Sequence, residues 1–186
     1  MFALFLGFII IQRLIELFIA KSNEIWMKKL GGVETGQSHY RYMVLIHVLF
    51  FVSYIGEVVI FHKHISPWWP LLLVLFVFTQ IGRGWVIYTL GNYWNTKIII
   101  LPHSNVVKKG PYRFIKHPNY LIVTLEFLII PFMFQAYVTA LIFTFLNIWI
   151  LSIRIPLEEK ALNEGTDYEG VFTGRKRFVP VNPKRI

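Results

Sequence analysis

Long apolar stretches dominate this 186-residue sequence. They cover residues 2–20, 42–61, 68–90 and 120–153. A helix needs about 20 apolar residues to cross the hydrocarbon core of a bilayer, so each of the first three suits one span. The fourth is too long for one span and holds Pro131 near its middle, which favours a tight helical hairpin over 120–134 and 137–153. The sequence therefore predicts an all-α integral membrane protein with about five transmembrane helices, the last two forming a hairpin.

The distribution of Lys and Arg gives an independent check on this count. Sixteen of the 19 basic residues lie in three segments, namely 21–41, 91–119 and the tail from residue 154. The other connections hold only Lys63, and Arg13 and Arg83 lie inside spans. Positively charged loops stay on the cytoplasmic side of a membrane. We therefore expect a multi-pass protein of the plasma membrane with its N-terminus outside and its C-terminal tail in the cytoplasm.

Composition excludes several other classes of protein. The chain is 55% hydrophobic and only 16% charged, which does not fit a water-soluble enzyme or a disordered tail. It has no cysteine, so disulfides, thiolate metal sites and cysteine nucleophiles are excluded, and we expect no metal. The net charge of +9 favours contact with anionic membrane lipids, and we expect no nucleic-acid partner. We expect a single membrane domain over 1–186, with the first three spans in 1–90.

A few ionisable residues interrupt the apolar stretches: Arg13, Glu16, His47, Glu57, Arg83 and Glu126. Arg13 and Glu16 are three residues apart, so they can pair on one helical face. Arg83 can pair with Glu126 or another carboxylate within the membrane. Glu57 is close to the outer interface, where we expect water to solvate it. The histidine fits a hydrogen-bonded core residue, and the sequence does not decide whether His47, Arg83 or Glu126 takes part in a site.

Two polar segments flank the predicted hairpin, so its antiparallel arms bring them together. In the first, His117 precedes Pro118. Proline disfavours a helical backbone at the residue before it and suits the first turn of a helix. The free N–H groups of such a helix end can hold a carboxylate or a phosphate. The same pattern also fits an ordinary span entry with interfacial anchors.

The second polar segment begins at Arg154, four residues before Glu158. The two lie on one face if the helix continues through Pro156, and they are then candidates for a clamp that holds an anion and a cation. Further on, Arg175, Lys176 and Arg177 form a basic run that we expect to face lipid.

These segments together resemble the isoprenylcysteine carboxyl methyltransferase family. The resemblance rests on Gly110-Pro-Tyr112-Arg-x-x-Lys-His117-Pro-x-Tyr120, followed by Arg154-x-x-x-Glu158-Glu159. It extends to Leu90-Gly91-x-x-Trp94, Gly165-x-x-Tyr168 and Arg177-x-x-Pro180, and covers roughly residues 83–183. Lys116 stands where the family usually has arginine; it keeps the charge but loses the bidentate fork.

The resemblance implies that residues 91–186 form a methyltransferase region that uses S-adenosylmethionine. Arg154 and Glu158 would be catalytic, with Arg154 contacting the substrate. The residues implied in cofactor binding are Ser104, Asn105, Val106, Val107, Tyr112, His117, Pro118, Asn119, Tyr120, Glu158 and Glu159. Aromatic faces and a carboxylate suit the cofactor's sulfonium and ammonium, and a helix N-terminus suits its carboxylate.

The resulting hypothesis is direct methylation of an acidic oxygen on a lipophilic substrate. An acceptor that is already an anion needs no general base. The short chain resembles bacterial members found beside type III polyketide synthases, which implies an alkylpyrone or alkylresorcinol acceptor and such a synthase as a partner. A prenylcysteine carboxyl methyltransferase, an NADPH-dependent sterol-type reductase and a non-catalytic scaffold stay open as alternatives. The oligomeric state, the substrate entry path and the exact acceptor are not predicted.

Overall fold

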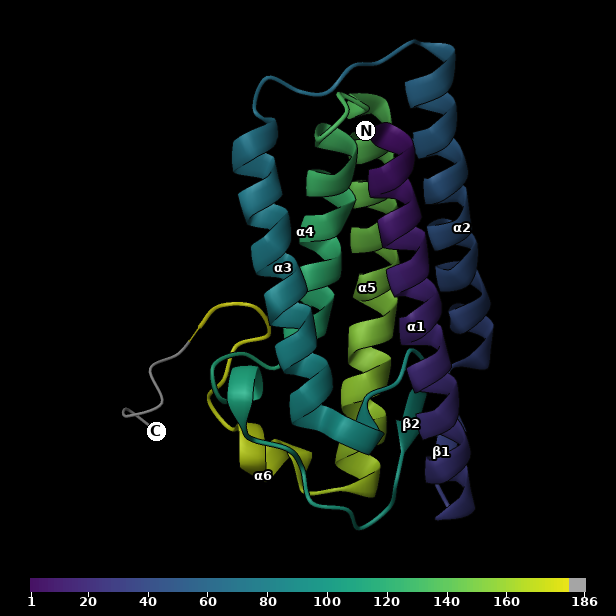
Figure 1. Ribbon diagram of the computed structural model, residues 1–186. Helices are drawn as coiled ribbons and strands as arrows, with labels where there is room; N and C mark the ends of the chain where they lie inside the picture. Colours follow the sequence, from purple (N-terminus) through teal and green to yellow (C-terminus); the bar gives the residue numbers. More distant parts are fainter. Residues whose placement is uncertain (181–186) are drawn as a thin grey trace.

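The computed structural model describes residues 1–180 and contains five long helices that run along a common axis (Figure 1). These are α1 (Phe2–Lys29), α2 (Gln37–Ile60), α3 (Trp69–Leu90), α4 (Pro118–Phe132) and α5 (Tyr137–Gly165). In the described part, α1, α2, α3 and α5 are long and apolar enough to cross a membrane, and α4 is a shorter apolar helix of 15 residues. A mostly helical membrane protein is therefore confirmed, while the number of spans stays a prediction.

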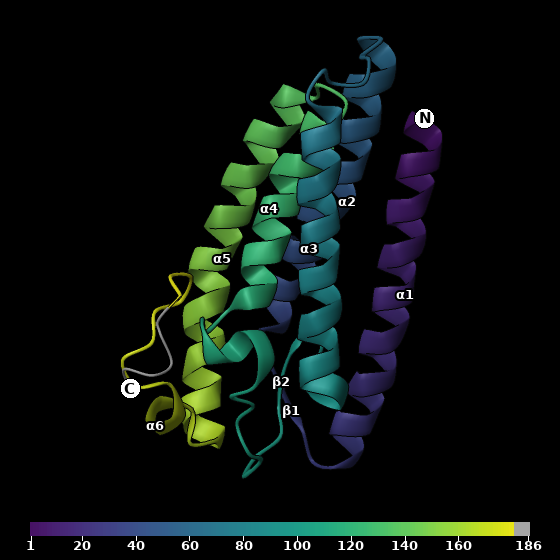
Figure 2. The same cartoon turned by 60° about the vertical axis from the view of Figure 1, so that its left-hand side comes forward.

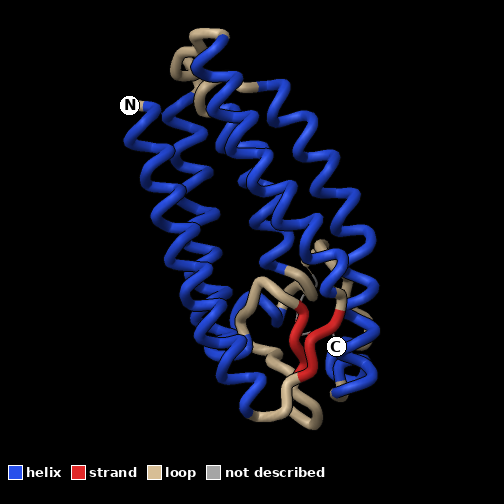
Figure 3. Tube along the Cα trace, turned by 90° about the vertical axis from the view of Figure 1, so that its right-hand side faces the viewer, coloured by secondary structure: helices blue, strands red, loops and turns tan. Residues whose placement is uncertain are grey.

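The connections between helices gather at two opposite ends of the bundle (Figures 1 and 3). The N-terminus lies at one end, with the connections 61–68 and 133–136. The segments that carry most of the basic residues lie at the other end, which we call the basic end. Which end faces the cytoplasm stays a prediction. The sequence tally also includes Lys184 and Arg185, and the resemblance extends to Pro183; all three lie outside the described residues.

The basic end holds the short elements of the fold, one pair of which the sequence did not predict. Strands β1 (Val33–Thr35) and β2 (Ile98–Ile100) pair antiparallel, with Val33 opposite Ile100 (Figure 3). This pair of three-residue strands leaves the fold mostly helical, as predicted. Three consecutive isoleucines favour a strand, and the pairing ties the segment after α3 to the α1–α2 connection. The remaining short elements are η1 (Gly91–Tyr93), η2 (Gly110–Arg113) and α6 (Tyr168–Phe172).

Two prolines act as the sequence predicts. His117 has a non-helical backbone, with φ −125° and ψ 62°, and α4 begins at Pro118. Helix α5 continues through Pro156 for 29 residues. Arg154 and Glu158 therefore lie one helical turn apart on the same face of an unbroken helix.

Four charged residues of α1, α3 and α4 form one cluster inside the bundle; three of them are buried, and Arg13 is partly exposed. The expected pairs are confirmed: Arg13 lies 2.6 Å from Glu16, and Arg83 donates to Glu126. Arg13 also donates to Glu126, and Arg83 lies 3.3 Å from Glu16. Gln80 donates a further hydrogen bond of 2.9 Å to Glu126. The cluster is electrically neutral, which lowers the cost of holding charge within the membrane.

Glu57 is buried, so the expectation that water solvates it was wrong. Its carboxylate accepts hydrogen bonds from the backbone N–H of Val138 and Thr139, at 3.2 and 2.7 Å, and from the Thr139 hydroxyl at 2.7 Å. These N–H groups belong to the first turn of α5 and have no partner within their own helix. A side chain of α2 therefore caps α5, and its negative charge also suits the positive end of the helix dipole.

An aromatic core joins the helices between the cavity and the end that holds the N-terminus. There Phe50 of α2 stacks edge-on against Phe127 and Phe143, with ring centroids 4.6 and 5.7 Å apart. Phe2 makes similar contacts with Tyr54 and Phe134 at 5.3 and 5.1 Å, which fix the start of α1 to the bundle. Between this aromatic core and the basic end, the helices enclose a cavity.

Candidate functional site

The cavity has a volume of about 390 Å³ and extends from the loops at the basic end into the helix bundle. Its outer part is lined by polar and aromatic residues of the segment 93–120 and by the last turns of α5. Its inner part is lined by side chains of α1, α2, α4 and α5, which include Leu17, His47, Phe51 and Val123. One continuous space therefore joins the polar loops to the apolar interior of the bundle.

Most of the site residues implied by the sequence line this cavity. They are Ser104, Asn105, Val106, Val107, Tyr112, His117, Asn119, Tyr120, Arg154 and Glu158. Two do not line it. Pro118 opens helix α4, and Glu159 bonds to His117 and to the tail. The structure thus brings together loop residues and α5 residues that are about 40 positions apart in the sequence.

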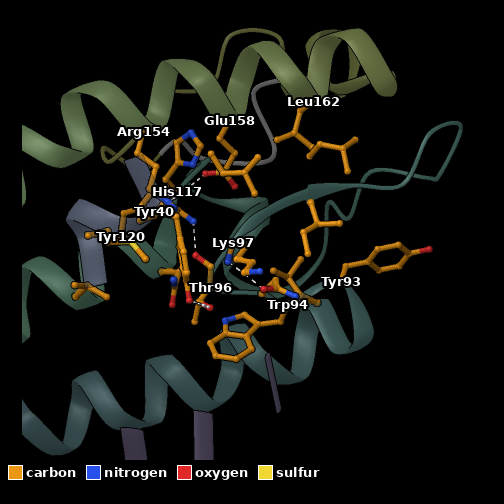
Figure 4. Close-up of a pocket in the computed structure, with 18 of the residues that line it drawn as sticks. Tyr40, Tyr93, Trp94, Thr96, Lys97, His117, Tyr120, Arg154, Glu158 and Leu162 are labelled. Carbon is orange, nitrogen blue, oxygen red and sulfur yellow. Dashed lines mark hydrogen bonds between the residues drawn. The ribbon is translucent and has the colours of Figure 1, made fainter. Parts of the chain in front are cut away.

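Arg154, Tyr120 and Glu158 form a hydrogen-bonded chain in the cavity wall (Figure 4). Arg154 Nε donates to the Tyr120 hydroxyl at 2.8 Å, and that hydroxyl donates to Glu158 Oε2. Arg154 Nη2 donates to the backbone carbonyl of Thr96 at 2.5 Å. The sequence predicted that Arg154 and Glu158 act as a pair, and the structure places the phenol between them. These bonds hold the buried guanidinium in one orientation.

The C-terminal tail packs against the start of α4. His117 Nε2 lies 3.0 Å from Glu159 Oε1, and Arg177 donates to the other oxygen of Glu159 at 2.6 Å. The backbone N–H of His117 donates to the carbonyl of Arg177 at 3.2 Å. Because the carboxylate can only accept, His117 carries a proton on Nε2. The imidazole is thus held at the cavity wall by Glu159 of α5, and the tail braces both residues through Arg177.

Within the basic run of the tail, Arg175 does not face lipid as the sequence predicted, whereas Lys176 and Arg177 are exposed. Arg175 is buried and donates to the backbone carbonyls of Tyr112, at 3.0 Å, and Arg113. Arg177 pairs with Glu159 as described above. These two arginines therefore hold the loop that carries Tyr112 in place. Three consecutive basic residues could not reveal this role, because a solvated run and an inward-facing one have the same composition.

Several buried polar atoms at the outer part of the cavity have no partner among residues 1–180. They are Trp94 Nε1, Asn119 Oδ1 and the Tyr168 hydroxyl, and all three residues line the cavity. Leaving such a group unpaired costs about 1–3 kcal/mol, so the site suits a ligand with complementary donors and acceptors. Burial raises the pKa of Tyr112 and Tyr168, and nearby acidic side chains raise both further. Both phenols therefore stay neutral and can donate.

Sequence reasoning missed the contribution of the first half of the chain. The cavity is also lined by Tyr40, Met43, Val44, His47, Val48 and Phe51 of α2. Their spacing of three and four residues places them on one face of a helix. That stripe was visible in the sequence, but an apolar span gives no sign of which face meets a cavity and which meets lipid. Thr96 and Lys97 also line the cavity, and they closely follow Trp94, the last residue of the motif Leu90-Gly91-x-x-Trp94.

Comparison with known proteins decides the family. The chain matches the isoprenylcysteine carboxyl methyltransferase (ICMT) family over residues 71–164, which include all of α4 and nearly all of α3 and α5. It is 47% identical to the uncharacterized protein YpbQ of Bacillus subtilis over 164 residues, 88% of this chain and 98% of that protein. It is 28% identical to an uncharacterized protein of Haemophilus influenzae over 152 residues, 81% of this chain and 88% of that protein.

The chain belongs to the ICMT family. It is thus a multi-pass membrane protein of a methyltransferase family, and the methyltransferases of this family use S-adenosylmethionine. The outer part of the cavity fits that cofactor on its own chemistry. Neutral phenols and the unpaired indole N–H can donate to its carboxylate and ribose oxygens, while Asn119 Oδ1 and Glu158 can accept from its ammonium.

Proposed function

We propose that this ICMT-family protein transfers a methyl group from S-adenosylmethionine to an acidic oxygen of a lipophilic acceptor. The observation that carries the proposal is the single cavity with two chemically different parts. Its outer part is polar, rich in tyrosine and close to the aqueous loops. Its inner part is apolar and lies among helices that cross the membrane. Such a cavity brings a water-soluble cofactor and a lipid into contact.

The cofactor is assigned to the outer part. Residues 104–107 and Asn119 would hold its polar ends, while Tyr112 and Tyr120 provide aromatic faces for its positive charges. Glu158 adds a negative charge beside Tyr120. When bound, S-adenosylmethionine would supply a methyl group on a positively charged sulfur, which keeps the bonding electrons as the acceptor oxygen takes the methyl group. His117 lines the same wall, and Glu159 supports it by its hydrogen bond to the imidazole.

The acceptor is assigned to the inner part. Leu17 of α1 and Val44 and Val48 of α2 line the cavity, yet they are 49%, 41% and 54% exposed on the surface of the bundle. The cavity therefore opens between α1 and α2 toward the bilayer, and Figure 2 shows α1 standing apart from the other helices there. A lipid tail can stay in the membrane while the head of the same molecule enters the cavity.

Arg154 would hold the acceptor oxygen between the two parts. Its Nε donates to the Tyr120 hydroxyl and its Nη2 donates to the Thr96 carbonyl. Its Nη1 has no hydrogen-bond partner in residues 1–180, so this nitrogen can donate to the acceptor oxygen. An acceptor that is anionic at neutral pH needs no general base. Residues of the chain then contribute by positioning and by excluding water.

More specifically, we propose a polyketide alkylpyrone or alkylresorcinol as the acceptor. This rests on the resemblance described above and on the apolar lining of the inner cavity. The proposal also includes a plasma-membrane location with the basic end in the cytoplasm, where the cofactor is made. Residues 1–90 would then supply most of the acceptor wall, and residues 91–186 most of the cofactor wall.

The test uses the full chain purified in detergent with S-adenosylmethionine labelled in its methyl group. Alkylpyrone, alkylresorcinol and prenylcysteine acceptors are supplied separately, and transfer of label to lipid is measured. We expect transfer to the first two. Transfer to prenylcysteine alone would replace the acceptor, and binding of NADPH in place of S-adenosylmethionine would overturn the reaction class.

Arg154→Ala tests the assigned role of the guanidinium. We expect turnover to fall by more than 100-fold, because the charged hydrogen bond that positions the acceptor oxygen is lost. Cofactor affinity should change little, because Tyr120 keeps its hydrogen bond to Glu158. Arg41→Ala, at an exposed arginine of α2, is the matched control and should leave both unchanged. Equal losses of turnover and cofactor affinity in Arg154→Ala would contradict the role.

A further inference from the structure

His47 presents a free hydrogen-bond acceptor to the inner cavity. Its Nδ1 lies 2.8 Å from the backbone carbonyl of Met43, and a carbonyl can only accept, so Nδ1 carries the proton. In the neutral ring Nε2 is then an acceptor, and within residues 1–180 it has no hydrogen-bond partner. The ring is held edge-on against Phe127, with centroids 5.1 Å apart. The hydrogen bond to Met43 and the contact with Phe127 fix the orientation of the ring, and thus of its acceptor nitrogen Nε2.

The space beside His47 suits one small polar group. His47, Arg13 and Glu126 line a separate recess of about 20 Å³, which has room for a single water molecule or hydroxyl. On α5, Asn147 also lines the main cavity and is almost fully buried. Its amide N–H donates to Thr124 at 2.9 Å, and its carbonyl oxygen has no partner in the described part of the chain. Two acceptors of hydrogen bonds therefore lie in the inner cavity.

The depth of this inner pair relative to Arg154 follows from the two helices. His47 follows Tyr40 by seven residues on α2, and Asn147 precedes Arg154 by seven on α5. Tyr40 and Arg154 both bond to Thr96, so the ends of their side chains lie close together. Seven residues are about two turns of helix and rise about 10 Å. His47 and Asn147 are therefore attached about two turns deeper in the bundle than Tyr40 and Arg154, so a polar group that meets them lies farther into the bundle than an oxygen held beside Thr96.

We propose that His47 is a specificity-determining residue that accepts a hydrogen bond from a second hydroxyl of the acceptor, while Arg154 holds the oxygen to be methylated. This rests on the proposed methyl transfer and narrows its substrate class. The two oxygens belong to one ring of the acceptor, and the alkyl tail leaves between α1 and α2. The two oxygens of a single carboxylate share one carbon, so they are too close together to bridge the two levels.

The test compares two acceptors that differ by one hydroxyl, a 5-alkylresorcinol and a 3-alkylphenol with the same chain. The wild-type protein should prefer the resorcinol by about tenfold in kcat/KM, the value of one buried hydrogen bond. His47→Leu should abolish this preference, so that the ratio of the two kcat/KM values in the variant falls to about one. His47→Gln, whose amide oxygen can still accept, should keep part of it. His64→Leu, at an exposed histidine in the α2–α3 connection, is the matched control.

The outcomes separate this inference from the proposed function. If the wild-type protein methylates both acceptors with equal kcat/KM, or if His47→Leu retains the preference, the second site is refuted and methyl transfer stands. If no acceptor is methylated, the proposed function fails. The preference is then read from binding of the two acceptors, followed by tryptophan fluorescence. Equal affinity of the wild-type protein for both, or an unchanged preference in His47→Leu, overturns the role of His47 as well.

Discussion

The buried charge cluster allows a quantitative test of how the bundle is held together. Glu126 bonds to both Arg13 and Arg83, and together with Glu16 these residues balance two positive against two negative charges. Glu126→Gln keeps the size of the side chain but leaves one positive charge unbalanced in the membrane interior. Breaking a buried ion pair from one side costs about 3–5 kcal/mol. We expect the free energy of unfolding to fall by that amount.

A second substitution turns this expectation into a test of the mechanism. Arg83→Gln added to Glu126→Gln restores neutrality and keeps the 2.6 Å pair between Arg13 and Glu16. The double variant should therefore recover at least half of the lost stability, although each single variant is destabilised. The assay is equilibrium unfolding in mixed detergent micelles, followed by tryptophan fluorescence.

An exposed ion pair on α5 provides the control. Glu164 is exposed and lies 3.8 Å from Lys160, so Glu164→Gln should cost less than about 0.5 kcal/mol. If the losses in Glu126→Gln and Arg83→Gln simply add in the double variant, the cluster is not coupled and the reasoning from charge balance is wrong.

Two further predictions follow from contacts outside the cavity. Glu57→Gln keeps one acceptor oxygen but removes the charge that caps α5, so unfolding free energy should fall by about 1–2 kcal/mol; a loss as small as that of Glu164→Gln would contradict the cap. Arg177→Ala removes the ion pair with Glu159 and loosens the tail from His117. The Kd for S-adenosylmethionine, measured by calorimetry, should then rise up to about fivefold, and kcat at saturating cofactor should stay unchanged. Lys176→Ala is its control, since only the backbone carbonyl of Lys176 bonds to the loop, and an equal effect there would contradict the assignment to Arg177.

The sequence predicted the features that depend on local patterns. Hydropathy located every long helix, and His117-Pro118 marked the start of α4 to the residue. What it could not predict depends on partners distant in the chain. Glu57 was misread because its partners are backbone N–H groups about 80 residues away, which have no sequence signature. The position of Tyr120 between Arg154 and Glu158 likewise requires knowing how α4 packs on α5.

The inner wall of the cavity was missed for a different reason. Side chains such as Val44, Val48 and Leu17 are apolar whether they face lipid or a cavity, so hydropathy treats the two surroundings alike. The three-residue strands were missed because segments this short carry little periodic signal.

The uninterrupted length of α5 has a consequence for how the protein meets different membranes. Its 29 residues span about 43 Å, whereas the hydrocarbon core of a bilayer is about 30 Å thick. Asn147, Arg154 and Glu158 therefore lie on one continuous helix, which is not interrupted at the membrane surface. A thicker or thinner bilayer can raise or lower this helix, but it cannot change the separation of the three side chains. Lipid composition should thus alter how readily an acceptor reaches the cavity and leave the internal geometry of the site unchanged.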